Sequence, residues 1–134
     1  MKIVVVDGQG GRLGALVVAG IVSEHLPCDL LAIGTNSAAT AAMLKAGASS
    51  GATGENPLLV ACRNADCIIG PIGILSADSL LGEITPAMAV AVGQSAAVKL
   101  LLPVSHCNNQ VIGVRPMSLN DLAREAVERL KELL

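Results

Sequence analysis

Apolar and polar residues alternate along the chain in blocks whose lengths fit strands and helices in turn. Residues 1–6 (MKIVVV) are dominated by β-branched types, which is typical of a strand buried on both faces. A glycine-rich turn follows over residues 7–14 (DGQGGRLG). Residues 15–25 form an apolar stretch that predicts a helix ended by Pro27, and residues 30–33 (LLAI) predict a second strand.

The same alternation continues toward the end of the chain. Capping residues at 34–37 predict a helix over 38–46, with Gly47 at its carboxyl end. Residues 48–56 (ASSGATGEN) form a loop that allows a very short strand near its start, and residues 74–83 fit no pattern. Further predicted elements are a short helix from Pro57 to about Asn64, strands over 66–69 and 98–104, a helix over 86–92 without charges, and a weaker strand over 111–114.

The last helix has the clearest pattern. Ser118 predicts its amino-terminal cap, and Asp121 three residues later gives an arrangement that resembles a capping box. The apolar residues that follow recur at helical spacing and the charged residues fall between them, so the charges should face solvent.

Strands that alternate with helices favour right-handed crossovers and a parallel sheet. We therefore predict an α/β fold, with residues 1–134 in a single three-layer Rossmann-like domain. Its central sheet should be mostly parallel and contain about five strands.

The composition excludes several classes of function. The 134 residues include no Phe, Tyr or Trp, and 52% of them are hydrophobic, so the core must be aliphatic. Without aromatic rings the chain has no stacking platform for single-stranded nucleic acid, no usual stacking partner for a flavin, and no tyrosine acid. The net charge of −2 without a basic stripe argues further against nucleic acid and anionic membranes as partners.

The chain is expected to be cytoplasmic. No uninterrupted apolar run reaches the roughly 18 residues that span a bilayer, and Asp7 interrupts the first run, which reads as a strand rather than a signal peptide. The four cysteines include no C-x-x-C pair and fit reduced thiols, and their spacing predicts no metal site. The apolar composition and the uncharged helix over 86–92 predict a homo-oligomer.

Glycine and small polar residues gather directly after the predicted strands. Because the carboxyl ends of parallel strands share one edge of the sheet, where ligands bind, we expect a site there. The glycine-rich turn offers bare backbone N–H groups and the positive end of a helix, which suit a small anionic ligand with a phosphate or carboxylate. The expected contact positions are Gly8, Gln9, Gly10, Gly11, Gly14, Thr35, Asn36, Asn56 and Gly73.

The sequence does not identify a cofactor. Gly8, Gly11 and Gly14 give the spacing G-x-x-G-x-x-G, a variant of dinucleotide-binding loops, but the standard G-x-G-x-x-G is not met. NAD(P) is not supported, because Thr35 and its neighbours stand where a ribose-binding acid is expected, and no second-strand Arg offers a partner for a 2′-phosphate. Dinucleotide binding, another anionic ligand and purely structural glycines therefore stay open.

Four residues are candidates for charge chemistry. Asp7 ends the first predicted strand, where its carboxylate could hold a metal or act as a base. Glu55 and Glu83 stand in uncharged surroundings, where burial would shift a pKa, although each also suits a helix N-terminus. His106 follows a strand and could be an acid–base group, or a loop histidine without a chemical role. Two alternatives to a binding domain follow: a small enzyme using Asp7, Glu55 or Glu83 with or without Mg²⁺, and a structural subunit without a ligand.

The segments DGQGGRLG, GTNSAATAAMLKAGA, GATGEN, ADCIIGPIGI and LGEITPAMA together resemble a family of short bacterial proteins catalogued as domain of unknown function family 3842. The resemblance extends over nearly the whole chain, and Arg12 departs from a third consecutive glycine in the family pattern. It implies a bacterial cytoplasmic protein and implies no activity or catalytic residue. The preferred interpretation is a small-ligand binding domain that holds a nucleotide or another anion at the glycine loop.

Overall fold

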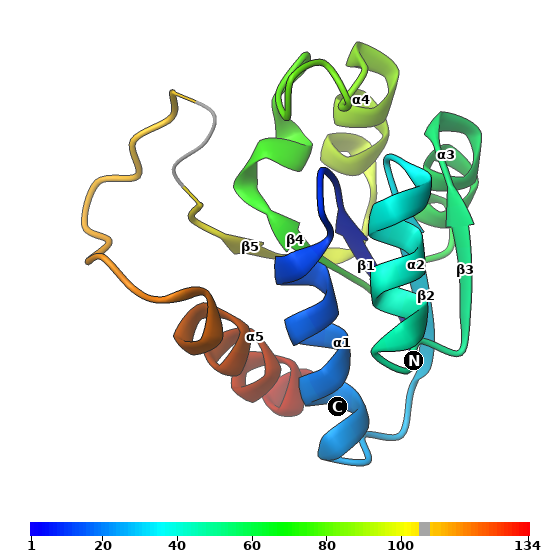
Figure 1. Cartoon of the computed structure of the whole chain (residues 1–134), viewed down its shortest axis with the longest axis vertical. Helices are drawn as coiled ribbons and strands as arrows, with labels where there is room; N and C mark the ends of the chain where they lie inside the picture. The colour runs from blue at the N-terminus through cyan, green and yellow to red at the C-terminus, as the bar shows by residue number, and fades with distance from the viewer. Residues whose placement is uncertain (105–107) are drawn as a thin grey trace.

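The computed structural model describes residues 1–104 and 108–134. Within these residues, strands and helices alternate along the chain (Figure 1). The strands are β1 (Lys2–Asp7), β2 (Asp29–Gly34), β3 (Ser50–Thr53), β4 (Cys67–Pro71) and β5 (Val98–Leu102). The α-helices are α1 (Arg12–Ser23), α2 (Ser37–Lys45), α3 (Glu55–Cys62), α4 (Pro86–Gln94) and α5 (Leu119–Leu133), and a 3₁₀-helix, η1, covers Ile72–Leu75.

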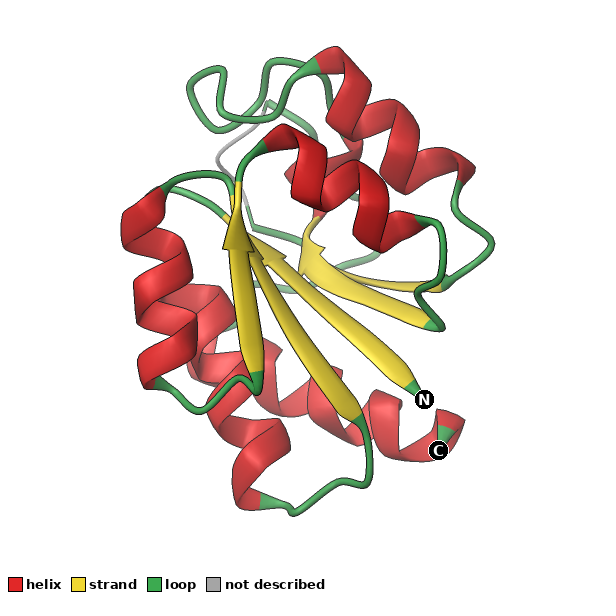
Figure 2. Ribbon diagram, turned by 90° about the vertical axis from the view of Figure 1, so that its right-hand side faces the viewer, coloured by secondary structure: helices red, strands yellow, loops and turns green. Residues whose placement is uncertain are grey.

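The described strands form one parallel sheet with β1 at its centre, in the order β3-β2-β1-β4-β5. Val5 of β1 is aligned with Ala32 of β2 on one side and with Ile69 of β4 on the other. Figure 2 shows the strands fanning out between two layers of helices. The predicted α/β fold, with a Rossmann-like parallel sheet, is confirmed.

The central strand is buried on both faces, which explains its unbroken apolar sequence. Ile3 and Val5 face a cluster built by α1, α5 and Met43 of α2, while Val4 and Val6 face a cluster built by α3, α4 and the segment between β4 and α4. All four β1 side chains are fully buried. A strand covered by helices on both sides has no polar face, so its sequence shows no alternation.

Helix α5 forms as its sequence predicts. The Ser118 hydroxyl accepts a hydrogen bond from the backbone N–H of Asp121 at 3.1 Å and caps the helix. Leu130 is fully buried against α1, whereas the charged Glu128 is exposed. In the described part of the chain, no helix combines the length and the apolar character needed to cross a membrane.

The prediction of a strand over residues 111–114 is wrong. Gly113 has a φ of +88°, which turns the chain out of the extended conformation that a strand requires. Val111, Ile112 and Val114 are 41%, 91% and 45% exposed. The segment from residue 108 to α5, gold to orange in Figure 1, runs outside the sheet, so the apolar side chains of residues 111–114 reflect neither pairing nor core packing.

Candidate functional site

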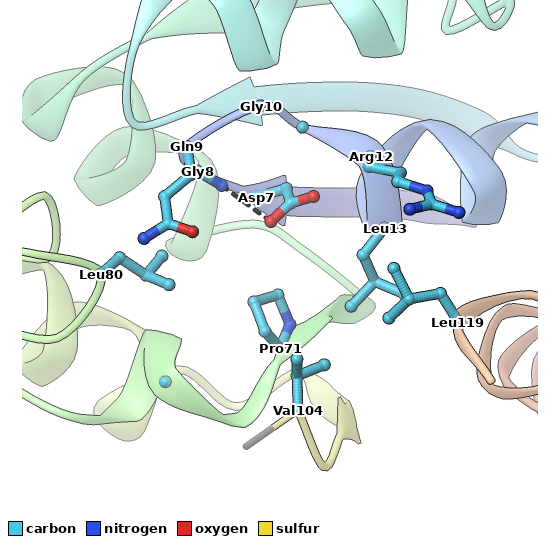
Figure 3. A pocket seen from close by; sticks show the side chains of 12 residues that line it. Asp7, Gly8, Gln9, Gly10, Arg12, Leu13, Pro71, Leu80, Val104 and Leu119 are labelled. Atoms are coloured by element: carbon cyan, nitrogen blue, oxygen red, sulfur yellow. Dashed lines mark hydrogen bonds between the residues drawn. The ribbon is translucent and has the colours of Figure 1, made fainter. Parts of the chain in front are cut away.

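A cavity of about 170 Å³ lies at the carboxyl edge of the sheet, where the strand order reverses. The chain passes from β1 to β2 and β3 on one side and then crosses to β4 and β5 on the other side. One side of the cavity is formed by residues 7–12, from the last residue of β1 to the first residue of α1 (Figure 3). The other lining residues are Leu13, Pro71, Gly73, Leu80, Val104 and Leu119.

The carboxylate of Asp7 accepts two hydrogen bonds from backbone N–H groups of the glycine loop. Its Oδ1 accepts a hydrogen bond from the N–H of Gly8 at 2.8 Å, and its Oδ2 accepts one from the N–H of Gly14 at 2.6 Å. Burial raises the pKa of Asp7 above its ordinary value, and although the bonds from Gly14 and Gly8 lower it, the charge of Glu83 raises it further. Asp7 thereby satisfies a first-turn N–H of α1 that would otherwise lack an intrahelical partner.

Two of the loop glycines are required by packing and backbone conformation. Gly11 has a φ of +70°, and a Cβ there would lie 2.6 Å from the backbone Cα of Ala39. Gly14 already belongs to α1, which begins earlier than predicted, and a Cβ there would lie 2.6 Å from Sδ of Met43. At Gly10, by contrast, a Cβ would have no neighbour within 4 Å. Gly10 is therefore the loop glycine that packing does not explain.

Three of the residues that line the cavity have backbone donors without a partner in the described part of the chain. The N–H groups of Gln9 and Gly11 donate hydrogen bonds inside the protein, at 3.0 and 2.9 Å. Among the described residues, the N–H groups of Gly10, Arg12 and Leu13 have no hydrogen-bond partner. The Arg12 side chain is exposed and forms no ion pair with any described carboxylate. These donors can hold an anionic group at the start of α1.

Glu83 ties three loops together beside the cavity. Its Oε1 accepts hydrogen bonds from Oγ1 of Thr35 at 2.7 Å, Nδ2 of Asn36 at 2.6 Å and the N–H of Gln9 at 3.0 Å. Partial burial acts to raise the pKa of Glu83, but the bonds from Thr35, Gln9 and Asn36 together bring it below its ordinary value. Glu83 precedes α4 in the chain, as predicted, but its hydrogen bonds join the β4–α4 segment to the loops after β1 and β2.

The structure brings some of the predicted site residues together and separates others. Gly8, Gln9, Gly10, Gly11, Gly73 and Asp7 line the cavity. Thr35 and Asn36 contact Glu83 and do not line it, and Gly14 lies in the helix–strand contact. Glu55 and Asn56 are exposed in the first turn of α3 and do not line the cavity. His106 lies outside the described residues.

A family model described as Domain of unknown function (DUF3842) matches residues 2–134. This chain belongs to the DUF3842 family. The match confirms the family that the sequence segments resemble. No curated protein sequence matches the chain.

The DUF3842 chain is also similar to a solved structure, described as a dodecameric FMN-dependent UbiX-like decarboxylase from Escherichia coli O157:H7. The two share 13% sequence identity with a TM-score of 0.44, over 99% of this chain and 94% of that chain. At this identity the likeness concerns the fold alone.

Sequence reasoning missed the apolar walls of the cavity in the DUF3842 chain. Leu80 and Leu119 reach it from segments far apart in the sequence, and Leu119 carried only the signal of a core position in a helix. Leu80 lies in the region that fits no periodic pattern, because its backbone is left-handed with a φ of +54°. No local signal marks either residue as a wall of a site.

Among the described residues of the DUF3842 chain, no group of three His, Cys, Asp or Glu side chains is placed to share a metal ion. Asp7 lines the cavity with both oxygens already accepting hydrogen bonds. Among the described residues that line the cavity, the charged ones are Asp7, whose carboxylate has a raised pKa, and Arg12.

Proposed function

We propose that this chain binds a small ligand with a phosphate or carboxylate group in the cavity at the carboxyl end of β1. The observation that carries the proposal is the position of the cavity between β1 and β4, where the strand order reverses. Open parallel sheets bind their ligands in the crevice at this point, because the loops on the two sides diverge there.

The cavity residues divide into a polar and an apolar set. The N–H groups of Gly10, Arg12 and Leu13, with the Arg12 guanidinium, suit the anionic group of the ligand, and the positive end of the α1 dipole adds to their attraction. The walls contributed by Leu80 and Leu119 suit a small apolar portion. A volume of about 170 Å³ corresponds to roughly five or six water molecules, which is enough for a phosphate or a short carboxylic acid.

The test is titration of the protein with inorganic phosphate and sulfate, followed through the backbone amide resonances of the loop. We expect saturable shifts at the amides of Gly10, Arg12 and Leu13. Arg12→Ala should weaken sulfate binding by roughly 5- to 30-fold, since it removes a charge-assisted hydrogen bond of about 1–2 kcal/mol. Arg124→Ala is the matched control, because Arg124 is an exposed arginine on α5 that pairs with Asp121.

The proposal fails if neither anion, nor any nucleotide in a panel, moves the loop amides at millimolar concentration. It also fails if Arg12→Ala and Arg124→Ala change the affinity equally. In the first case the scaffold interpretation without a ligand gains support, and in the second case the attraction is a general effect of positive charge.

A catalytic alternative rests on Asp7. It is buried, lines the cavity and has a raised pKa, and such a carboxylate is a candidate acid or base. Glu55 and Glu83, the other two carboxylates considered for an enzyme, do not line the cavity. Asp7→Asn would then abolish turnover of a substrate while its affinity persists, whereas a binding domain shows no turnover to lose.

We also propose that the chain forms a homo-oligomer through α3 and α4. Val60 and Val90 are 45% and 53% exposed on these helices. A groove between the two helices is lined by apolar and uncharged residues, with Arg63 as the charged residue among the described lining residues. A face that carries so little charge suits a second copy of itself. Val90→Glu should reduce the mass measured by sedimentation equilibrium to that of one chain, and an unchanged mass contradicts this interface.

A further inference from the structure

The segment 76–85 crosses the carboxyl edge of the sheet and covers the glycine loop on its β2 side. A Cβ placed on Gly8 would lie 2.5 Å from Oγ1 of Thr35, 2.9 Å from Cδ1 of Leu80 and 3.1 Å from Oε1 of Glu83. The space above Gly8 is therefore filled by the protein's own side chains. Figure 3 shows Leu80 on this side of the cavity, across from Leu13 and Leu119.

The polar groups at the end of β2 are bonded within the protein. Thr35 donates its hydroxyl to Glu83, and Nδ2 of Asn36 donates to Glu83 and to the carbonyl oxygen of Gln9 at 2.9 Å. Oδ1 of Asn36 accepts from the N–H of Ala39 at 2.9 Å and caps α2. In dinucleotide-binding sheets this position holds the acid that binds a ribose hydroxyl. In this chain the position is occupied by the carboxylate of Glu83, which belongs to the β4–α4 segment and already accepts hydrogen bonds from Thr35 and Asn36.

The covering segment is held in a defined shape by its own backbone. Asp78, Leu80 and Leu81 have φ values of +65°, +54° and +57°, in the left-handed region that non-glycine residues rarely adopt. The N–H of Asp78 donates to the carbonyl oxygen of Ile84 at 2.7 Å and closes the segment on itself. Since Leu80 is 8% exposed while Leu81 is 95% exposed, the turn directs one leucine inward over the loop.

We propose that Leu80 and Glu83 determine the size of the ligand: they close the β2 half of the crevice, so the site takes a compact anion and excludes a nucleoside attached to it. This inference rests on the proposed function and adds the class of ligand. Pyrophosphate represents the compact class. ADP-ribose represents the extended class, because it carries the same diphosphate with a ribose on each side.

The experiment compares the affinities of pyrophosphate and ADP-ribose by isothermal titration calorimetry. For the wild-type chain we expect ADP-ribose to bind at least about tenfold more weakly than pyrophosphate, a difference of about 1.4 kcal/mol. Glu83→Ala, and separately Leu80→Ala, should raise the ADP-ribose affinity relative to the pyrophosphate affinity by about tenfold. Glu132→Ala is the matched control, because it removes one negative charge from the exposed surface of α5.

A second readout separates a local opening from general loss of structure. In the Glu83→Ala chain, ADP-ribose should shift the amide resonances of Thr35 and Asn36, whereas pyrophosphate should shift only the loop after β1. Far-UV circular dichroism checks that both variants retain their helices. If Leu80→Ala proves poorly folded, Glu83→Ala alone decides the matter, since Leu80 belongs to the buried core whereas Glu83 is only partly buried.

Three results would overturn the inference. One is that the wild-type chain binds ADP-ribose more tightly than pyrophosphate and loses this preference in Glu83→Ala, which would make Glu83 a ribose acceptor. Another is that pyrophosphate binds but neither variant gains ADP-ribose affinity, which removes this inference and leaves the proposed function standing. The third is that neither probe binds any of the chains, which removes both.

Discussion

Substitution of Gly11 by alanine should destabilise the fold far more than the same substitution at its neighbour Gly10. The two residues are adjacent glycines in the same loop, but their surroundings differ sharply. Gly11 has a φ of +70°, and its added Cβ would lie 2.6 Å from Cα and 2.9 Å from the carbonyl oxygen of Ala39. The Cβ at Gly10 would meet nothing within 4 Å, and its φ is not in the left-handed region.

The magnitude follows from two separate effects. A non-glycine residue in the left-handed region costs about 1–2 kcal/mol. Overpacking against a backbone that cannot move easily costs about 1–3 kcal/mol more, because α2 must shift away from the loop. Gly11→Ala should therefore lower the free energy of unfolding by about 2–5 kcal/mol, a large part of the 5–15 kcal/mol typical of a domain. Gly10→Ala should change it by less than about 0.5 kcal/mol.

The assay is urea unfolding followed by far-UV circular dichroism, because the chain has no aromatic residue to report by fluorescence. Equal slopes for wild type and both variants would show that only stability has changed. The reasoning is refuted if Gly11→Ala loses less than about 1 kcal/mol, or if Gly10→Ala loses as much as Gly11→Ala. If Gly10→Ala stays stable, it becomes the variant with which a methyl group at the cavity rim can be tested against ligands.

Three further predictions concern charge and burial. Glu83 has a pKa below its ordinary value of 4.5, so its hydrogen bonds contribute stability that is present above that pH and is lost as the pH falls through the lower pKa of the folded state. The urea midpoint of Glu83→Gln, measured between pH 3 and pH 7, should lack this loss. Identical pH profiles for Glu83→Gln and the wild-type chain would contradict the prediction. Asp7 has a raised pKa, and its ionised form repels a second anion, so calorimetry should show sulfate binding more tightly as the pH falls through that pKa. Asp7→Asn should flatten this pH dependence. If the pH dependence of sulfate binding persists in Asp7→Asn, another group causes it. Ile112→Ser should change the free energy of unfolding by less than about 0.5 kcal/mol, because Ile112 is 91% exposed. Leu130→Ala should lower it by about 2–5 kcal/mol, because Leu130 is fully buried. A large loss of stability in Ile112→Ser would show that residues 111–114 are packed after all.

Most of the elements were readable from local pattern because each has a period or a cap of its own. The unbroken apolar run at β1 and the helical spacing of α5 are set by burial, which the side chains record directly. Residues 111–114 show where this reading fails. Their composition is that of a strand, but Gly113 turns the chain and no strand pairs with them in the described structure. The composition of a segment indicates that it can form a strand, but a strand forms only where a neighbouring strand lies close enough to pair with it.

The candidate site was predictable as a place and less so as a set of contacts. The cavity lies at the glycine loop and at the sheet edge, as the sequence predicts. The sequence shows Asp7 and Gly14 seven positions apart without indicating that one caps the other. Asn56 was expected at the site because it follows a glycine loop, but it lies on the exposed first turn of α3. The cytoplasmic location and the oligomeric state stay predictions.

The alternation of strands and helices, the aliphatic core and the family could all be inferred from the amino-acid sequence, because these depend on residue types and on periodicities along the chain. The contact between Glu83 and Gln9, which lie 74 residues apart along the chain, became visible in the three-dimensional fold. The fold also showed that Leu80 and Leu119 form walls of the same cavity. Such contacts depend on the strand order and on backbone angles in irregular turns, and neither leaves a periodic trace in the sequence.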